Sequence, residues 1–141
     1  MELNSLVTTK FEPRTGDGPK TFLCKKVAEA WRGEPLPAFG SFATDQGSVL
    51  EEEAKPWYSL NFDTDIQSVG FIEGNDGRCG CSPDGLIGDD GGIEIKCPEA
   101  HTHVQYLMDG KLPNDYIAQI HMNLFVTNRQ WWKFVSYRRK F

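Results

Sequence analysis

Apolar side chains recur at helical spacing in three stretches of the chain. The first covers residues 20–32, where apolar positions three and four residues apart predict a helix that ends at Gly33. The second covers residues 44–58, and Pro56 is expected to kink or stop it, because proline removes a backbone donor and clashes with the preceding turn. The third covers residues 113–128. The side chains expected to face the core are Leu23, Val27, Ala30 and Trp31 in the first helix, Val49, Leu50 and Ala54 in the second, and Ile117, Ile120 and Leu124 in the third.

Alternating or continuous apolar positions predict four strands. Three of them cover residues 66–73, 78–88 and 92–98, and a Gly- and Asp-rich turn at 89–92 leads into the last of these. The fourth strand, over residues 131–138, follows the third helix. This order of elements predicts an α/β fold, a small mixed β-sheet flanked by helices, and the length favours a single domain.

The composition is that of a folded, soluble chain. Hydrophobic residues make up 39% of the sequence and aromatic residues 12%, which is enough for a core. No apolar run reaches the roughly 18 residues of a membrane helix and no secretory leader opens the chain, so we expect a cytoplasmic protein without membrane association. The net charge of −5 argues against nucleic-acid binding, although a local basic stripe or bound metal ions can still hold phosphates.

Cysteines and histidines are too sparsely placed to predict a structural metal site. One residue separates Cys79 from Cys81 and fifteen separate Cys81 from Cys97, which is not the paired spacing of zinc ligands. We therefore expect reduced thiols at small, buried strand positions. An iron–sulfur nuclease is disfavoured because no cysteine lies beyond Cys97. His101 and His103 lack a further ligand cluster and are expected in a loop.

The segment with the most specific chemistry is "SPDGLIGDDGGIEIKCP". Side chains alternate along a strand, so Glu94 and Lys96 should share one face while the isoleucines beside them share the other. Pairing with the preceding strand would place Asp84 next to them. Two carboxylates can hold Mg²⁺, and a lysine can activate water and stabilise charge on a phosphate, so the set suits phosphodiester hydrolysis. Taken alone, these residues favour a solvated hairpin that carries ordinary surface charges over a nuclease site.

The longer run "CSPDGLIGDDGGIEIKCP", followed by "DYIAQIHMNLFVTNRQWWKFVSY", strongly resembles the phage lambda exonuclease / YqaJ-type viral recombinase family of the PD-(D/E)xK superfamily. The resemblance covers about residues 44–138 and extends more loosely to the front. It implies a restriction-endonuclease-like PD-(D/E)xK core and a Mg²⁺-dependent exonuclease, with Mn²⁺ able to substitute. Such an enzyme degrades one strand of double-stranded DNA from a 5′ end and leaves a 3′ overhang for a single-strand annealing partner in phage-type recombination. Relatives of this kind can assemble as a ring-shaped trimer around DNA.

The resemblance also implies roles for individual residues. Asp84 and Glu94 would bind the metal, and Lys96 would be the catalytic lysine. The other implied site residues are the helical carboxylate Glu51, the main-chain carbonyl of Ile95, which would face the metal, and Gln119 of the "AQ" motif, which is expected near the nucleophilic water.

The front of the chain departs from the family pattern. Relatives carry an arginine and a "TAS"-like serine that grip the 5′ phosphate, whereas this stretch reads "LVTTKF". Lys10 could supply the charge, and Thr8 or Thr9 the hydroxyl. The chain also ends at Phe141, where relatives continue, so the resemblance leaves open whether the ring-forming surface is present. These departures keep two alternatives open: a non-catalytic DNA-binding scaffold on the same fold, and an endonuclease or nickase on the same core.

Overall fold

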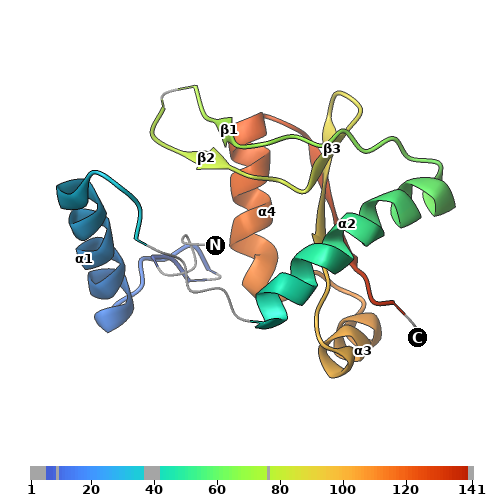
Figure 1. Cartoon of the computed structure of the whole chain (residues 1–141), viewed down its shortest axis with the longest axis horizontal. Coiled ribbons are helices and arrows are strands. Elements are labelled where there is room, and N and C mark those ends of the chain that lie inside the picture. Colours follow the sequence, from blue (N-terminus) through green and yellow to red (C-terminus); the bar gives the residue numbers. More distant parts are fainter. Residues whose placement is uncertain (1–5, 9, 37–41, 76, 140–141) are drawn as a thin grey trace.

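The chain folds into four helices and five short strands among the residues that the structure describes (Figure 1). The computed structural model describes residues 6–8, 10–36, 42–75 and 77–139. The helices are α1 (Asp17–Arg32), α2 (Phe42–Phe62), α3 (Ala100–Asp109) and α4 (Asn114–Thr127). The strands are β1 (Ile72–Glu73), β2 (Gly80–Cys81), β3 (Gly85–Ile87), β4 (Gly91–Lys96) and β5 (Trp131–Ser136). Strand β4 lies between β3, to which it is antiparallel, and β5, to which it is parallel, while β1 and β2 form a separate antiparallel pair.

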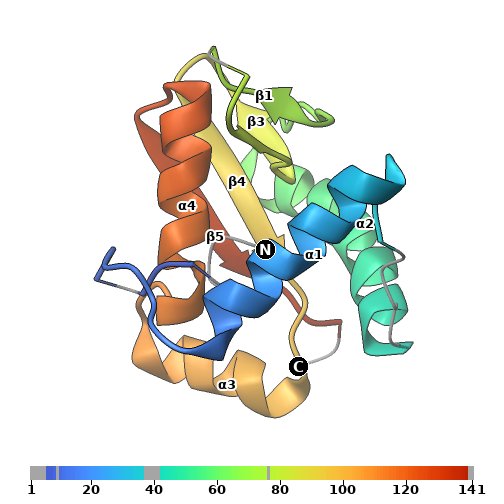
Figure 2. The ribbon, with the colours of Figure 1, turned by 90° about the vertical axis from the view of Figure 1, so that its left-hand side faces the viewer.

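The core forms where β4 meets α2. Ile93 and Ile95 of β4 are fully buried and pack with Ala54 and Tyr58 of α2 and with Tyr137, which follows β5. Burial of an isoleucine side chain contributes roughly 1.5–3 kcal/mol, so these contacts hold α2 against one face of β4. Helix α4 lies on the other side of the sheet, as Figure 2 shows. Strand β4 is therefore covered on both faces.

The predicted α/β fold, a small mixed sheet flanked by helices, is confirmed. The helix expected over residues 113–128 is α4, and the strand expected over 131–138 is β5. A parallel partner for β4 requires a crossover connection instead of a hairpin, and residues 97–130 provide it through α3 and α4. Strand β4 begins at Gly91, one residue before the expected start at Gly92, so both glycines of the expected turn lie in the strand.

Helix α2 continues through its proline, so it does not stop there. Pro56 was expected to kink or stop the helix, but α2 runs on to Phe62. Buried Ala54 and Tyr58 lie on either side of the proline and pack on β4, and this tertiary contact stabilises both halves of the helix. Val49, which was expected to face the core, is 69% exposed, so the buried stripe of α2 starts further along the helix.

The strands before β4 are shorter than predicted. The expected strand over residues 66–73 is reduced to β1, together with a single bridge between Gln67 and Leu86. The expected strand over 78–88 is divided into β2 and β3, because Pro83 between them has no backbone N–H to donate. Asp84 consequently lies just before β3, and not at the end of a strand.

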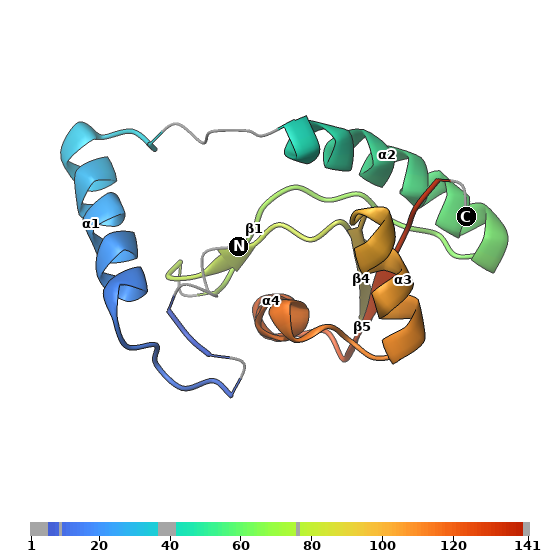
Figure 3. The same ribbon diagram turned by 90° about the horizontal axis from the view of Figure 1, so that it is seen from below.

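Helix α1 ends as predicted but does not bury its apolar face. Gly33 follows it in the left-handed conformation, with φ of 72°. Leu23 is 58% exposed and Trp31 is 87% exposed, and no residue of α1 is buried. Figures 1 and 3 show α1 apart from the three-stranded sheet. None of the helices in the described part of the chain combines the length and the apolar character that crossing a membrane would require.

Two expectations about cysteines and histidines are corrected. All four cysteines are free thiols, and Cys81 is buried in β2, but Cys24 is exposed on α1 instead of lying in a strand. His101 and His103 lie in α3 and not in a loop. His103 is buried, and its Nδ1 lies 2.7 Å from Oγ of Ser136 in β5. This polar contact helps to hold α3 on the sheet, and hydrophobic periodicity gives no sign of it.

Candidate active site

A buried carboxylate and a lysine lie side by side on β4. The side chain of Glu94 is 1% exposed, and Nζ of Lys96 lies 2.6 Å from its Oε1. The two residues alternate with Ile93 and Ile95, which point to the α2 side, so the predicted division of β4 into a polar and an apolar face is confirmed. Removing a carboxylate from water is costly unless it is paired and hydrogen-bonded, so Glu94 needs further partners.

Helix α4 supplies those partners from two side chains one turn apart. Nε2 of Gln119 donates to Oε1 of Glu94, and Nδ2 of Asn123 donates to Oε2 at 3.2 Å. Positions four residues apart lie on the same face of a helix, so one stripe of α4 reaches both oxygens. Sequence reasoning singled out Gln119 but missed Asn123. Its signal was a second amide side chain one turn after Gln119 on the same face of the helix.

Asp84 directly precedes β3 and contacts the backbone of β4. Its Oδ2 accepts a hydrogen bond from the backbone N–H of Ile95 at 2.6 Å. The ladder to β5 uses the backbone of Lys96, whose carbonyl accepts from the N–H of Tyr137. Neighbouring residues of a strand point their backbone groups to opposite sides, so both the N–H and the carbonyl of Ile95 face the side where Asp84 lies.

Glu51 reaches this site from α2. It is partly buried and lies one turn before Ala54, which packs on β4. Burial raises the pKa of Glu51, the charge of Asp84 raises it further, and Lys96 and Lys55 oppose the shift. The charges of Asp84 and Lys96 act on the carboxylate of Glu51, so Glu51 lies within electrostatic range of the residues on β4.

Several carboxylates and the single ammonium group of Lys96 determine the electrostatics of the site. Burial raises the pKa of Glu94, and the charge of Asp84 adds to this, while Lys96 opposes it. Burial by itself would lower the pKa of Lys96, but the carboxylates of Glu94, Asp84 and Glu51 raise it. The amine is therefore protonated at neutral pH. Three carboxylates and one ammonium leave excess negative charge, which a divalent cation would relieve.

The donor set suits a hard divalent cation in chemistry and charge. Carboxylate and carbonyl oxygens are the ligands that Mg²⁺ prefers, and Glu51, Asp84, Glu94 and the carbonyl of Ile95 are all oxygen donors. Within the described residues, however, no three His, Cys, Asp or Glu side chains are gathered as a ready-made metal cage. Instead, the ammonium of Lys96 lies against Glu94. These residues therefore fit Mg²⁺ by the type of their donor atoms and by their excess negative charge.

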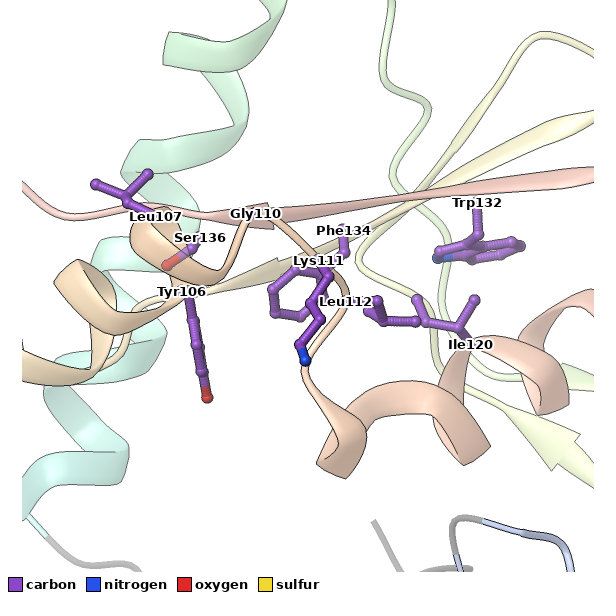
Figure 4. A pocket seen from close by; sticks show the side chains of 9 residues that line it. All are labelled: Tyr106, Leu107, Gly110, Lys111, Leu112, Ile120, Trp132, Phe134 and Ser136. Atoms are coloured by element: carbon purple, nitrogen blue, oxygen red, sulfur yellow. The ribbon is translucent and has the colours of Figure 1, made fainter.

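Two hollows lie on the α4 side of the sheet, and Lys96 and the two amides that bind Glu94 line only one of them. The first has a volume of about 530 Å³ and is lined by Lys96, Gln119 and Asn123, together with Tyr116 and residues of β2. The second, of about 390 Å³, lies between α3, the loop after it and β5 (Figure 4). Its side chains are mainly apolar, Trp132 among them, and the charged residue that lines it is Lys111, which lies outside β4. We therefore assign the chemistry to the first hollow.

The segment expected to grip a 5′ phosphate lies beside α4. Lys10 is exposed in a turn, where Oγ1 of Thr8 accepts hydrogen bonds from the backbone N–H groups of Lys10 and Glu12 at 3.3 and 3.2 Å. The ring of Phe11 meets that of His121 on α4, with 5.1 Å between centroids. The turn is thereby held next to the helix that carries Gln119. The third candidate for this pocket, Thr9, lies outside the described residues.

Comparison with known proteins identifies a family and similar solved structures. A family model described as the YqaJ-like viral recombinase domain matches residues 7–130. The chain is similar to the alkaline exonuclease LHK-Exo from Laribacter hongkongensis, with 29% sequence identity and a TM-score of 0.78 over 94% of this chain and 69% of that chain. A structure of LHK-Exo in complex with dAMP gives the same identity and a TM-score of 0.79 over 95% of this chain and 70% of that chain. No curated protein sequence matches significantly.

Proposed function

The chain belongs to the YqaJ-like viral recombinase domain family and has the PD-(D/E)xK-like fold of the alkaline exonuclease LHK-Exo, and from this premise we propose that it is a Mg²⁺-dependent exodeoxyribonuclease. It hydrolyses phosphodiester bonds of double-stranded DNA from an end, in the 5′ to 3′ direction. The 3′ overhangs that it leaves serve recombination by single-strand annealing. Residues 1–141 act as a single nuclease domain in this proposal.

The observation that carries the proposal is the ion pair between buried Glu94 and partly buried Lys96 on β4, with Asp84 at the backbone of the same strand. A buried ion pair rarely stabilises a fold, because the loss of hydration offsets the attraction between the charges. A protein that only bound DNA would have no use for such a pair on a central strand. Phosphodiester hydrolysis does need this set, because it requires oxygen ligands for a cation and a positive group beside the phosphate.

The metal-binding groups in this proposal are Glu51, Asp84, Glu94 and the main-chain carbonyl of Ile95. When bound, Mg²⁺, or Mn²⁺ in its place, would neutralise charge at the phosphate and would lower the pKa of a coordinated water. The protonated amine of Lys96 donates to a phosphate oxygen or to the attacking water and offsets developing negative charge.

Gln119 and the N-terminal turn complete the substrate site. Gln119, whose amide lies at Glu94, orients the attacking water. Lys10 and Thr9 hold the 5′ phosphate of a DNA end, supported by the position of this turn beside α4. The same proposal includes a single-strand annealing protein as partner and a homo-oligomer around the DNA in the bacterial cytoplasm.

A cleavage assay on three DNA substrates tests the proposal. Linear duplex with a 5′ phosphate, linear duplex without it and a closed circle are incubated with Mg²⁺, beside an Asp84→Asn variant that keeps the size of the side chain. We expect loss of linear DNA only, faster with the 5′ phosphate, and none with the variant. A label at the 5′ end released before one at the 3′ end would fix the direction.

Each other outcome assigns a different function. Cutting of the closed circle would identify an endonuclease or nickase on the same core. Binding of DNA without cutting, in Mg²⁺ and in Mn²⁺, would refute an enzyme and leave a DNA-binding scaffold. Activity that persists in Asp84→Asn would show that the proposed carboxylates do not form the site.

A further inference from the structure

One buried side chain at the candidate site has no part in the function proposed above. Asn123 of α4 is 1% exposed, and its Nδ2 donates to Oε2 of Glu94 at 3.2 Å. Its backbone carbonyl accepts from Oγ1 of Thr127 at 2.7 Å, which secures the turn of α4 that carries it. Burying an amide is unfavourable unless its polar atoms are paired. The hydrogen bond to Glu94 therefore offsets the cost of burying Asn123.

Asn123 differs from the other partners of Glu94 in the oxygen that it binds. Gln119 and Lys96 both reach Oε1, whereas the donor to Oε2 among the described residues is Asn123. A carboxylate held by one oxygen can still rotate about its last bond. Donors at both oxygens fix the plane of the group and therefore the directions in which its remaining lone pairs point.

We propose that Asn123 is a positioning residue that fixes the orientation of the Glu94 carboxylate for a divalent cation. The proposal rests on the function proposed above, because it assumes that Glu94 is a metal ligand. The outer partners of ligating carboxylates contribute to metal affinity, and their removal typically weakens binding about 10–100-fold. Asn123 acts through Glu94 and need not touch the substrate.

The test compares metal binding with folding in three variants. Asn123→Leu keeps the branching and the number of heavy atoms of the side chain and removes the donor, although leucine is bulkier. Asn123→Ala removes it without adding bulk and replaces Asn123→Leu should that variant not fold. Thr127→Val is the matched control, since it removes a hydrogen bond of the same helix turn but leaves the donor to Glu94 intact. Mn²⁺ binding to each DNA-free protein is measured by titration calorimetry, and folding of the metal-free proteins by thermal unfolding.

We expect the Kd for Mn²⁺ to rise about tenfold or more in Asn123→Leu, and the Mn²⁺ concentration for half-maximal cleavage to rise in proportion. The rate at saturating Mn²⁺ should change much less, and Thr127→Val should bind Mn²⁺ as the wild type does. A wild-type Kd in the folded Leu or Ala variant would overturn the role of Asn123 while leaving the nuclease intact. A wild-type protein that neither binds Mn²⁺ nor cuts DNA would overturn the proposed function, and this inference with it.

Discussion

Two tryptophans of β5 lie over two glycines of β4. This close contact predicts that a larger residue at either glycine lowers the stability of the protein. The parallel register pairs Gly91 with Trp131 and Gly92 with Trp132. A Cβ added at Gly92 would lie 2.5 Å from Cζ3 and 2.6 Å from Cζ2 of Trp132, and closer still to Cη2. Real Cβ atoms essentially never approach other atoms within 3.0 Å. Gly92→Ala must therefore displace the indole ring or separate the strands.

The expected cost follows from the rigidity of the ring. Overpacking a well-packed site typically costs about 1–3 kcal/mol, because side chains and backbone shift together. An unfolding entropy of about 2.1 cal/mol/K per residue gives about 300 cal/mol/K for this chain, so the loss corresponds to a fall in Tm of about 3–10 °C. Gly70→Ala is the control, since a Cβ there meets nothing within 4 Å. It should leave Tm nearly unchanged.

A double-mutant cycle assigns the effect to the ring. Trp132→Phe removes the ring atoms that the new Cβ would meet, at a cost of its own from lost packing. If the clash is the cause, Gly92→Ala combined with Trp132→Phe should lose at least about 1 kcal/mol less than the sum of the single variants. Chemical denaturation of the four proteins measures this coupling. Additive losses, or a Gly92→Ala variant as stable as Gly70→Ala, would refute the argument.

Four further predictions follow from the site and from α2. Lys96→Met should lower the single-turnover rate of DNA cleavage at least about 100-fold while circular dichroism shows a folded protein, and a near-normal rate would exclude a catalytic lysine. Mn²⁺ affinity should fall on acidification at a pH above the ordinary carboxyl value of 4.5, because the pKa values of Glu51 and Glu94 are raised and the metal binds only their ionised forms. Calorimetry across a pH series checks this, and an affinity unchanged down to pH 4.5 contradicts it. Burial, with the charges of nearby acids, raises the pKa of Cys97 to about 11, so at pH 8 only about one thiol in a thousand is ionised, about 100-fold fewer than at a pKa of 9. Mass spectrometry should therefore find Cys97 alkylated far more slowly than the amino acid cysteine added to the same sample. Pro56→Ala should stabilise the protein by about 1–3 kcal/mol, since it restores a helix donor at an exposed position; a lower Tm would show that the proline itself is part of the packing.

Patterns between close neighbours in the chain were readable before the structure was known. The alternation of Glu94 and Lys96 with the isoleucines beside them depends only on the geometry of a strand, and the structure confirms it. The extent of α4 and the end of α1 at Gly33 follow equally from local periodicity and from the freedom of glycine to adopt a positive φ. These predictions held because they required no knowledge of what the element packs against.

Contacts between distant segments had to come from the tertiary structure. The position of Glu51 near Asp84 depends on how α2 crosses β4, and sequence periodicity alone did not separate it from the two glutamates that follow it. Asn123 became recognisable only when α4 was seen to place two amides on one carboxylate. The glycines at 91–92 had the composition of a turn, yet they form strand because the tryptophans of β5 fill the space above them. In each case the decisive energy is packing or charge between residues far apart in the sequence, and local preference carries no information about it.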